Sequence, residues 1–295
     1  TYFHAGMCQA ALAHIRHVKR FFRAGVAGEF DDIDMAMQMH SSKKTPEPTV
    51  AVGTSSNGFV GKTIQYVGRS AHAADAPDQG INALNAAMLG IMGINSLRET
   101  FRDEDAIRVH PIITKGGDLV NNVPDDVRIE TYVRAKTMEA IEKTHKKVDA
   151  ALRAGGMAIG AEVHIDTMPG HLPLVCNATL NELLVENAKE AFPSVKIINA
   201  GHFSASTDMG DVSHLMPAIH PFIGGTDGLL HGADFKVVDF NAAALLPGKA
   251  FAGMVIDLLA DNAQKAKALL DHYEPILTKD AYIKKLDSYF SEEEP

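Results

Sequence analysis

The hydrophobic pattern between Gly61 and Gly170 alternates between the period of a strand and the period of a helix. The clearest two-residue alternation runs through Val127–Ala135. In chain order the pattern predicts strand Lys62–Val67, helix Asn82–Phe101, strands Ile107–Thr114 and Val127–Ala135, helix Thr137–Ala154 and strand Glu162–Thr167. The turn-rich stretch Gly116–Asp126 suits a hairpin. This β-α-β-β-α-β order predicts a ferredoxin-like domain at residues 61–170.

The residues on either side of this insert have the mixed pattern of an α/β domain. Helices are expected at Gln9–Ala24, Ala178–Phe192 and Ala242–Asp261, a strand at Lys196–Asn199, and a helical tail interrupted at Pro275. Phe30–Met39 is a polar turn that leads into a short apolar run, and Ser41–Thr49 is expected to be a loop. We therefore predict a discontinuous α/β domain, residues 1–60 and 171–295, with the ferredoxin-like domain inserted in it.

Composition and charge narrow the class of protein. The 295 residues are 46% hydrophobic and 22% charged, which is ordinary for a globular chain. The formal net charge of −9 argues against nucleic-acid and membrane-surface partners. No apolar run reaches the roughly 18 residues of a membrane span, and no signal peptide is evident. The two cysteines, Cys8 and Cys176, cannot form a disulfide framework. We expect a cytoplasmic protein.

Three histidines lie where an imidazole could do chemistry. His40 follows the apolar run, and ligand sites in open α/β sheets form beyond the ends of strands. His231 lies among glycines in a long loop, where a metal ligand can be accessible. His72 lies between a predicted strand and a predicted helix, among small residues that allow a close approach. His40 could instead be a loop histidine without a partner, and His72 could be a histidine near a helix N-terminus that the backbone satisfies. The position of His231 is by itself a weak signal of metal binding.

Two further stretches carry polar candidates. Asn121 and Asn122 precede Pro124 at the predicted hairpin, where a side-chain amide is a fixed donor, although turn chemistry also favours Asn there. Asp208 lies among Ser, Thr and Gly, and it could equally cap a following helix.

The N-terminal histidines offer another possible metal site. His14 and His17 share a face of the first predicted helix. We expect them to be solvated surface residues, and the alternative is a metal site together with His4 or Cys8. The chain has no P-loop, GxGxxG, GxSxG, CxxC or HExxH motif.

Five stretches taken together resemble the M20 metallopeptidases, and within them the amidohydrolase branch of aminoacylase-like and aminobenzoyl-glutamate-hydrolase-like enzymes. They are FFRAGVAGEFDDIDMAMQMHS, GRSAHAADAPDQGINALNA, GGDLVNNVPDDVRIETYVRA, STDMGDVSHLMPAIHPFIG and LLHGADF, in family order across about residues 20–260. The predicted insert falls where that family has its dimerisation domain. The resemblance implies a zinc-peptidase-like catalytic α/β domain with this insert.

The resemblance also implies a chemistry. Two divalent metal ions, zinc or manganese, would polarise a scissile amide and activate a water. His40 and His231 would be metal ligands. His72 would reach into the partner subunit's site of a homodimer and stabilise the oxyanion, and Asn122 would hold the substrate in the same cross-subunit way.

Two more residues are assigned to the substrate by the same resemblance. Asp208 would be an active-site loop residue, and Arg134 would bind a substrate carboxylate. The substrate would be a small amide, namely an N-acyl amino acid, a dipeptide or an aminobenzoyl-glutamate-like compound.

The N-terminal part departs from the family pattern. The family has a Cys/His ligand loop and a Glu pair before the position of His40, but the stretch here reads ALAHIRHVKRFF, with no acidic residue before Glu29. We therefore expect that the N-terminal part of the catalytic domain is lacking. This leaves a second hypothesis, an inactive truncated homologue that acts as a dimerising or interaction protein. A third is a metal-binding protein that uses the N-terminal histidines.

Overall fold

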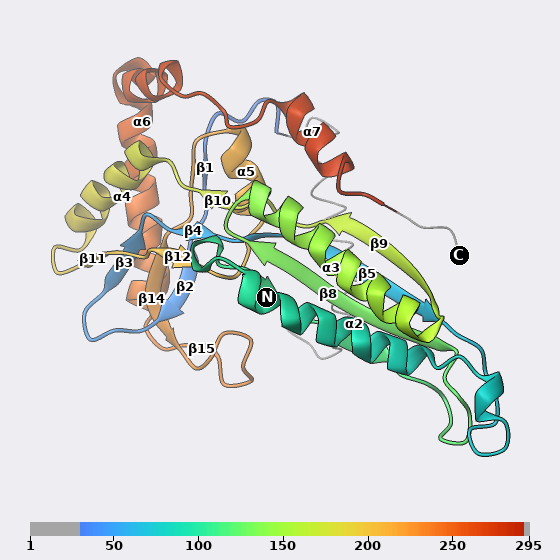
Figure 1. Ribbon diagram of the computed structural model, residues 1–295. Helices are drawn as coiled ribbons and strands as arrows, with labels where there is room; N and C mark the ends of the chain where they lie inside the picture. The colour runs from blue at the N-terminus through green and yellow to red at the C-terminus, as the bar shows by residue number, and fades with distance from the viewer. Residues whose placement is uncertain (1–29, 292–295) are drawn as a thin grey trace. The chain divides into compact units, whose positions relative to one another are not determined.

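The computed structural model describes residues 30–291, which divide into two compact units (Figure 1). The first unit contains residues 57–173 and 283–291, and the second contains residues 30–56 and 174–282. Each unit is therefore assembled from segments that are separated in the sequence. The predicted domain boundaries remain predictions, and the predicted helix Gln9–Ala24 lies outside the described residues.

The first unit is built on an antiparallel sheet (Figure 1). Its strands are β5 (Gly58–Val67), β6 (Arg108–Val109), β7 (Ile112–Lys115), β8 (Asp126–Ala135) and β9 (Glu162–Pro169). β5 lies between β8 and β9, while β6 and β7 pair in succession with the other edge of β8. The predicted strand Ile107–Thr114 is two strands, because Pro111 has no N–H to donate.

Two long helices, α2 (Ala83–Leu97) and α3 (Met138–Ile159), cover one face of this sheet (Figure 1). Glycines allow them to approach closely, since a Cβ on Gly155 would collide with the backbone of Gly90. Short 3₁₀ helices lie at η1 (Pro77–Gln79), η2 (Arg98–Thr100) and η3 (Asp103–Asp105). The element order and the sheet order are those of a ferredoxin-like fold, so the predicted fold class is confirmed.

A buried ion pair crosses the core between β5 and α3. The side chain of Lys62 is fully buried, with Nζ 2.7 Å from Asp149 Oδ1 and 2.7 Å from the Thr167 hydroxyl. Nδ1 of His145, one turn before Asp149, lies 3.7 Å from the same carboxylate. Burial acts to raise the pKa of Asp149, but His145 and Lys62 outweigh it and hold that pKa below its usual value. The ammonium is tolerated in the core because it is paired.

The second unit contains a mixed sheet. Its strands are β2 (His40–Lys43), β3 (Thr49–Val52), β11 (Lys196–Asn199), β14 (Phe222–Asp227) and β15 (Lys236–Val237). Two smaller sheets of this unit contain β1 (Ala36–Met37) and β13 (Ala218–Ile219), and β4 (Ser55–Ser56), β10 (Leu174–Val175) and β12 (His202–Phe203). β14 lies between β2, which is parallel to it, and β3, which is antiparallel; β3 in turn pairs with β11. β1 pairs with β13, and β4 pairs with β10 and β12.

Helices pack against this sheet to form the core of the second unit. They are α4 (Ala178–Ala191), α5 (Met209–Leu215), η4 (Asn241–Leu245, a π turn) and α6 (Leu246–Asp271). The next helix, α7 (Lys279–Asp287), begins in the second unit, and its residues from Ile283 onward belong to the first. Fully buried side chains come from the strands, from α4 and from α6, and include Val50, Ile219, Ile223, Leu180, Leu184, Leu246 and Met254. The helical tail interrupted near Pro275 is confirmed by the gap between α6 and α7.

The segment around His40 differs from its prediction. Ser41–Thr49 was expected to be a loop, with His40 just beyond a strand, but His40–Lys43 form β2 and His40 is its first residue. The cause is parallel backbone pairing with β14, in which His40 lies opposite Phe222. Such pairing depends on a partner far away in the sequence and leaves no local pattern.

One helix is more apolar than the sequence pattern indicated. Asn241–Asp271 is long and apolar enough to cross a membrane by length and composition. Its backbone is not helical at Ala260–Ala263, and Leu246, Ala250 and Met254 face the core. These two features fit a helix that packs within the second unit.

The last described residues lie along β9 and α3 of the first unit. The backbone N–H groups of Ser291 and Thr167 each donate to the other's carbonyl, at 3.1 and 2.8 Å. Lys285 forms an ion pair with Glu142 of α3, and the Tyr289 ring meets His145 edge-on. The tail thus covers part of the free edge of β9.

We expect Asp149→Ala to lower the free energy of unfolding by about 3 kcal/mol, because it leaves the Lys62 ammonium buried without its carboxylate. Urea denaturation followed by circular dichroism measures this. Glu139→Ala is the matched control on the same helix, since it removes an exposed ion pair with Lys143 and should cost about 0.5 kcal/mol or less. Equal losses in both variants would contradict the assignment.

Candidate functional site

Two loops meet at one end of the first unit's sheet. Residues 68–82 follow β5 and carry His72, and residues 116–125 join β7 to β8 and carry Asn122. His72 and Asn122 are partners in an isolated antiparallel bridge, in which the Ala73 N–H donates to the Asn121 carbonyl at 2.8 Å. The predicted hairpin is confirmed, and two candidate residues from separate motifs lie side by side.

The backbone determines which nitrogen of His72 carries the proton. Nδ1 accepts hydrogen bonds from the N–H groups of Ala74 and Asp75, at 3.3 and 3.1 Å. A nitrogen that accepts is unprotonated, so the proton of the neutral ring is on Nε2. The His72 side chain is exposed. His72 can therefore present an N–H donor to a molecule outside its own loop.

Ionic contacts hold the hairpin that carries Asn122. The carboxylate of Asp126 accepts hydrogen bonds from Lys115 at 3.0 Å, from Gln65 at 2.8 Å and from Arg128 at 3.3 Å. Lys115 also lies 3.5 Å from Asp118 within the loop. Burial acts to raise the pKa of Asp126, but these hydrogen bonds outweigh it and lower the pKa to about 2. The two ends of the hairpin are thus fastened to each other and to β5.

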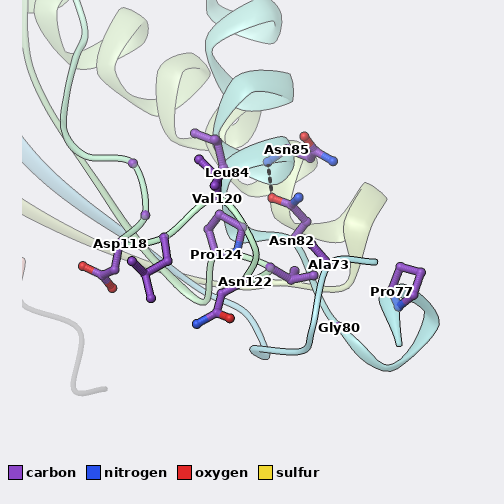
Figure 2. A pocket seen from close by; sticks show the side chains of 14 residues that line it. Ala73, Pro77, Gly80, Asn82, Leu84, Asn85, Asp118, Val120, Asn122 and Pro124 are labelled. Carbon is purple, nitrogen blue, oxygen red and sulfur yellow. Dashed lines mark hydrogen bonds between the residues drawn. The ribbon is translucent and has the colours of Figure 1, made fainter. Parts of the chain in front are cut away.

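A cavity of about 670 Å³ lies between these loops and the start of α2 (Figure 2). Its polar lining residues are Asn82, Asn85, Asp118 and Asn122. The Asn82 carboxamide is engaged as a helix cap, because its oxygen accepts from the Asn85 N–H at 3.0 Å (Figure 2). The volume is in the range of small-molecule sites, and the carboxamide of Asn122 is at its wall.

Arg134 lies at the other end of the same sheet. In the β5–β8 ladder it is opposite Phe59, whereas Val67, next to the His72 loop, is opposite Asp126. Eight residues of β8 separate the two ends, which is roughly 27 Å at the rise of an antiparallel strand. The structure does not bring Arg134 to His72 and Asn122 within one chain.

Arg134 lies against aromatic rings in a small pocket. Its guanidinium carbon is 5.0 Å from the Phe59 ring and 5.2 Å from the Tyr132 ring. Burial lowers the pKa of Arg134, and the arginine remains charged at neutral pH. A pocket of about 240 Å³ with Arg108, His110, Glu130 and Tyr132 in its wall adjoins this guanidinium. A single anionic group would fit such a pocket.

In the second unit, His40 has one ring nitrogen engaged. Its Nδ1 donates to the backbone carbonyl of Ser41 at 2.8 Å, which leaves Nε2 with its lone pair. The half-buried ring lies 5.1 Å from the ring of Phe222. Nδ1 bonded to a carbonyl and a free Nε2 is the arrangement of a metal-binding histidine.

A second imidazole, which the sequence reasoning missed, lies beside His40. The ring centroid of His220 is 6.0 Å from that of His40, and its ring stacks on Phe222. His220 is 4% exposed, and neither ring nitrogen has a hydrogen-bond partner among the described residues. Burial, with a smaller contribution from His40, lowers the pKa of His220 to about 4 against the opposing charge of Asp208. Its position in the stretch STDMGDVSHLMPAIHPFIG, two residues before Phe222, was the available signal.

His231 lies in the β14–β15 hairpin. It is exposed and has a left-handed backbone conformation, with φ of 64°. The hairpin leaves β14 at Asp227, whereas His40 is opposite Phe222 at the start of the same strand. Within residues 30–291, no three or more His, Cys, Asp or Glu side chains are grouped so that they could hold a metal ion.

Asp208 serves as a helix cap. Its carboxylate accepts from the Met209 N–H at 3.0 Å at the start of α5, which confirms the capping alternative. Its neighbour Asp211 is buried and accepts a hydrogen bond from Tyr282, whose pKa is raised by burial and by this carboxylate. The candidate metal ligands near the N-terminus, His4, Cys8, His14 and His17, lie outside the described residues.

The chain is similar to known proteins in sequence and in fold. Residues 38–158 match the M20 family described as "Peptidase dimerisation domain". The Xaa-Arg dipeptidase of Mus musculus is 32% identical over 244 residues, which are 79% of this chain and 54% of that protein. One of the two p-aminobenzoyl-glutamate hydrolase chains of Escherichia coli (strain K12) is 29% identical over 163 residues, which are 55% of this chain and 31% of that protein. The chain spans about half the length of the dipeptidase.

Solved structures of other proteins resemble this chain in fold. An aminohydrolase described as putative, from methicillin-resistant Staphylococcus aureus, has a TM-score of 0.63 at 17% identity, over 78% of this chain and 60% of that chain. The Bacillus subtilis YXEP protein, titled a dinuclear metal binding peptidase from the M20 family, has a TM-score of 0.60 at 17% identity, over 81% of this chain and 61% of that chain. At these identities the likeness concerns the fold.

We expect Asp126→Asn to destabilise the first unit by about 1 kcal/mol at pH 7, because a neutral amide loses the charge-assisted bonds from Lys115 and Arg128. The folded pKa is lower than the unfolded one, so the wild-type advantage is complete above about pH 4 and is lost as the pH falls toward 2. Urea denaturation of both proteins at pH 7, 4 and 3 measures the difference. A constant difference over this range would contradict the role of Asp126.

Proposed function

We propose that this chain, which belongs to the M20 peptidase family, forms part of a metal-dependent enzyme that hydrolyses an amide bond. The names of its relatives, a dipeptidase and an aminobenzoyl-glutamate hydrolase, support a small substrate with an amide next to a carboxylate. We infer an N-acyl amino acid, a dipeptide or an aminobenzoyl-glutamate-like compound. The observation that carries the proposal is the pairing of His72 with Asn122, with the His72 proton placed on Nε2.

The metal ligands we propose from this chain are His40 and His231. His40 fits the role, because its Nδ1 donates to a carbonyl and its Nε2 is left free. His231 has an exposed imidazole on a hairpin that would have to fold back along β14 to share an ion with His40. Two bound divalent ions, zinc or manganese, would polarise the amide carbonyl and lower the pKa of a bound water.

The substrate would be held by residues of the first unit. Nε2–H of His72 would donate to the carbonyl oxygen as negative charge develops on it, and the Asn122 carboxamide would hold the substrate beside it. Arg134 would bind the carboxylate, since its guanidinium remains charged in a small pocket. Asp208, which belongs to the second unit, would contribute as an active-site loop residue that caps α5.

The separation of Arg134 from His72 supports a homodimer. Because roughly 27 Å of β8 lies between the two ends of the sheet, Arg134 and His72 of one protomer cannot both bind one small substrate. They could do so if His72 and Asn122 came from a second copy of the chain. Exposed apolar side chains on α2 (Met88, Leu89 and Met92) and β7 (Ile112 and Ile113) offer the surface for such a contact.

A second candidate function keeps the dimer without the catalysis. It is favoured by one observation, that residues 30–291 contain no three-ligand metal group. In that case the chain would act as a dimerising or interaction protein. Chelator-sensitive hydrolysis of an Xaa-Arg dipeptide or of aminobenzoyl-glutamate by the full chain supports the first function, and its absence at saturating zinc and manganese supports the second.

We expect His72→Ala to lower kcat for amide hydrolysis about 100- to 1000-fold with unchanged metal content, because an oxyanion donor is lost. Mixing it with His40→Ala should restore about a quarter of the wild-type rate. Half of the dimers then contain one protomer of each variant. If His72 acts across the dimer, each of these mixed dimers has one intact site, which combines His40 of one protomer with His72 of the other. Differently tagged protomers verify that mixed dimers form. Mixed dimers without any recovery would contradict the cross-subunit role.

We expect Met92→Glu to weaken the dimer, because it places a charge in the apolar surface of α2, where Met92 is 60% exposed. Sedimentation velocity over a range of concentrations measures the shift from dimer to monomer. Met157→Glu on α3 is the matched control, since Met157 is 83% exposed outside this surface. An unchanged oligomeric state for Met92→Glu, or an equal shift in both variants, would argue against this interface.

A further inference from the structure

His220 occupies the same face of the second unit's sheet as His40. The parallel register places Ala36 opposite Ala218, Met37 opposite Ile219 and His40 opposite Phe222. Because side chains on one face recur every second residue, His220 and Phe222 share a face, and His40 lies on it beside them. The ring distances agree: 6.0 Å from His40 to His220, and 5.1 Å from His40 to Phe222.

The spacing of these two imidazoles matches that of two ligands on one cation. With Zn–N bonds of about 2.1 Å, each ring centroid lies about 3.2 Å from the metal. Two such rings at a tetrahedral angle have centroids about 5 Å apart, and a wider angle brings them to about 6 Å. The observed 6.0 Å between the two centroids lies at the wide end of this range.

The burial of His220 requires a partner for its ring. A buried polar group without a hydrogen bond costs on the order of 1–3 kcal/mol, and here both ring nitrogens are without a partner among the described residues. The nearby charge of Asp208 also favours a cation at this place. His214, by contrast, is buried with its Nδ1 bonded to the Gly210 carbonyl.

We propose that His220 is a ligand of the divalent transition metal that His40 binds, so that the two imidazoles form the inner part of a cation site. Neutral imidazoles suit zinc and cobalt among the divalent ions. This inference rests on the proposed function, because it takes His40 as a metal ligand. It adds a ligand that does not depend on how the His231 hairpin folds, since His40 begins β2 and the His220 ring stacks on Phe222, the first residue of β14.

The test uses the full chain carrying His231→Ala, which removes the other proposed ligand at an exposed position. Zinc and cobalt affinities are measured by competition with a chromophoric chelator, and X-ray absorption counts the imidazoles around bound zinc. We expect two imidazoles on the zinc in this background. Adding His220→Phe, which keeps the stacking on Phe222, should remove one of them and weaken binding by more than about 100-fold.

His214→Phe in the same background is the matched control for a buried histidine, and it should leave the imidazole count unchanged. Circular dichroism melting verifies that each variant is folded. A zinc ion with one imidazole in the His231→Ala protein, or unchanged affinity after His220→Phe, would overturn the role of His220 and leave the proposed function standing. If the wild-type chain binds neither cation, both the inference and the proposed metal-dependent function fail.

Discussion

The ten-residue antiparallel ladder between β5 and β8 is the constraint on which the first unit depends. It fixes Gly58 opposite Ala135 at one end and Val67 opposite Asp126 at the other. A shift by one residue would turn Lys62 away from Asp149 and move Arg134 off the face it shares with Phe59. The same register sets the His72 loop and the Asn122 hairpin together at one end. The distance between the Arg134 end and the His72 end is therefore a property of the sheet.

The fold of the first unit could be predicted because each of its elements has a local signal. Val127–Ala135 alternates strictly, Asn82 and Thr137 stand where helix caps belong, and the hairpin is rich in turn residues. Boundaries were less accurate: β5 begins at Gly58, four residues before the predicted strand, because Gly58 and Phe59 gain partners on β8. The structure places His72 beside Asn122, and the roles that the family resemblance implied for them stay predictions.

What the sequence could not supply is the pairing of distant strands in the second unit. His40 was placed beyond a strand, whereas its parallel pairing with β14 makes it the first residue of one. The same pairing brings His220 beside it, and no local pattern distinguishes that histidine from any other before a proline. The separation of Arg134 from His72 could likewise not be predicted from the sequence, because it follows from the length and register of β8 rather than from a motif.

The bridge between Ser291 and Thr167 has a consequence for assembly. A sheet can grow from either outer strand, and two open sides would permit endless stacking of copies. Here the chain's own tail occupies part of the β9 side, so within residues 30–291 the β7 side is the more open one. Association through a single side of the sheet terminates once two copies have met. The tail thus favours a closed pair over a fibre.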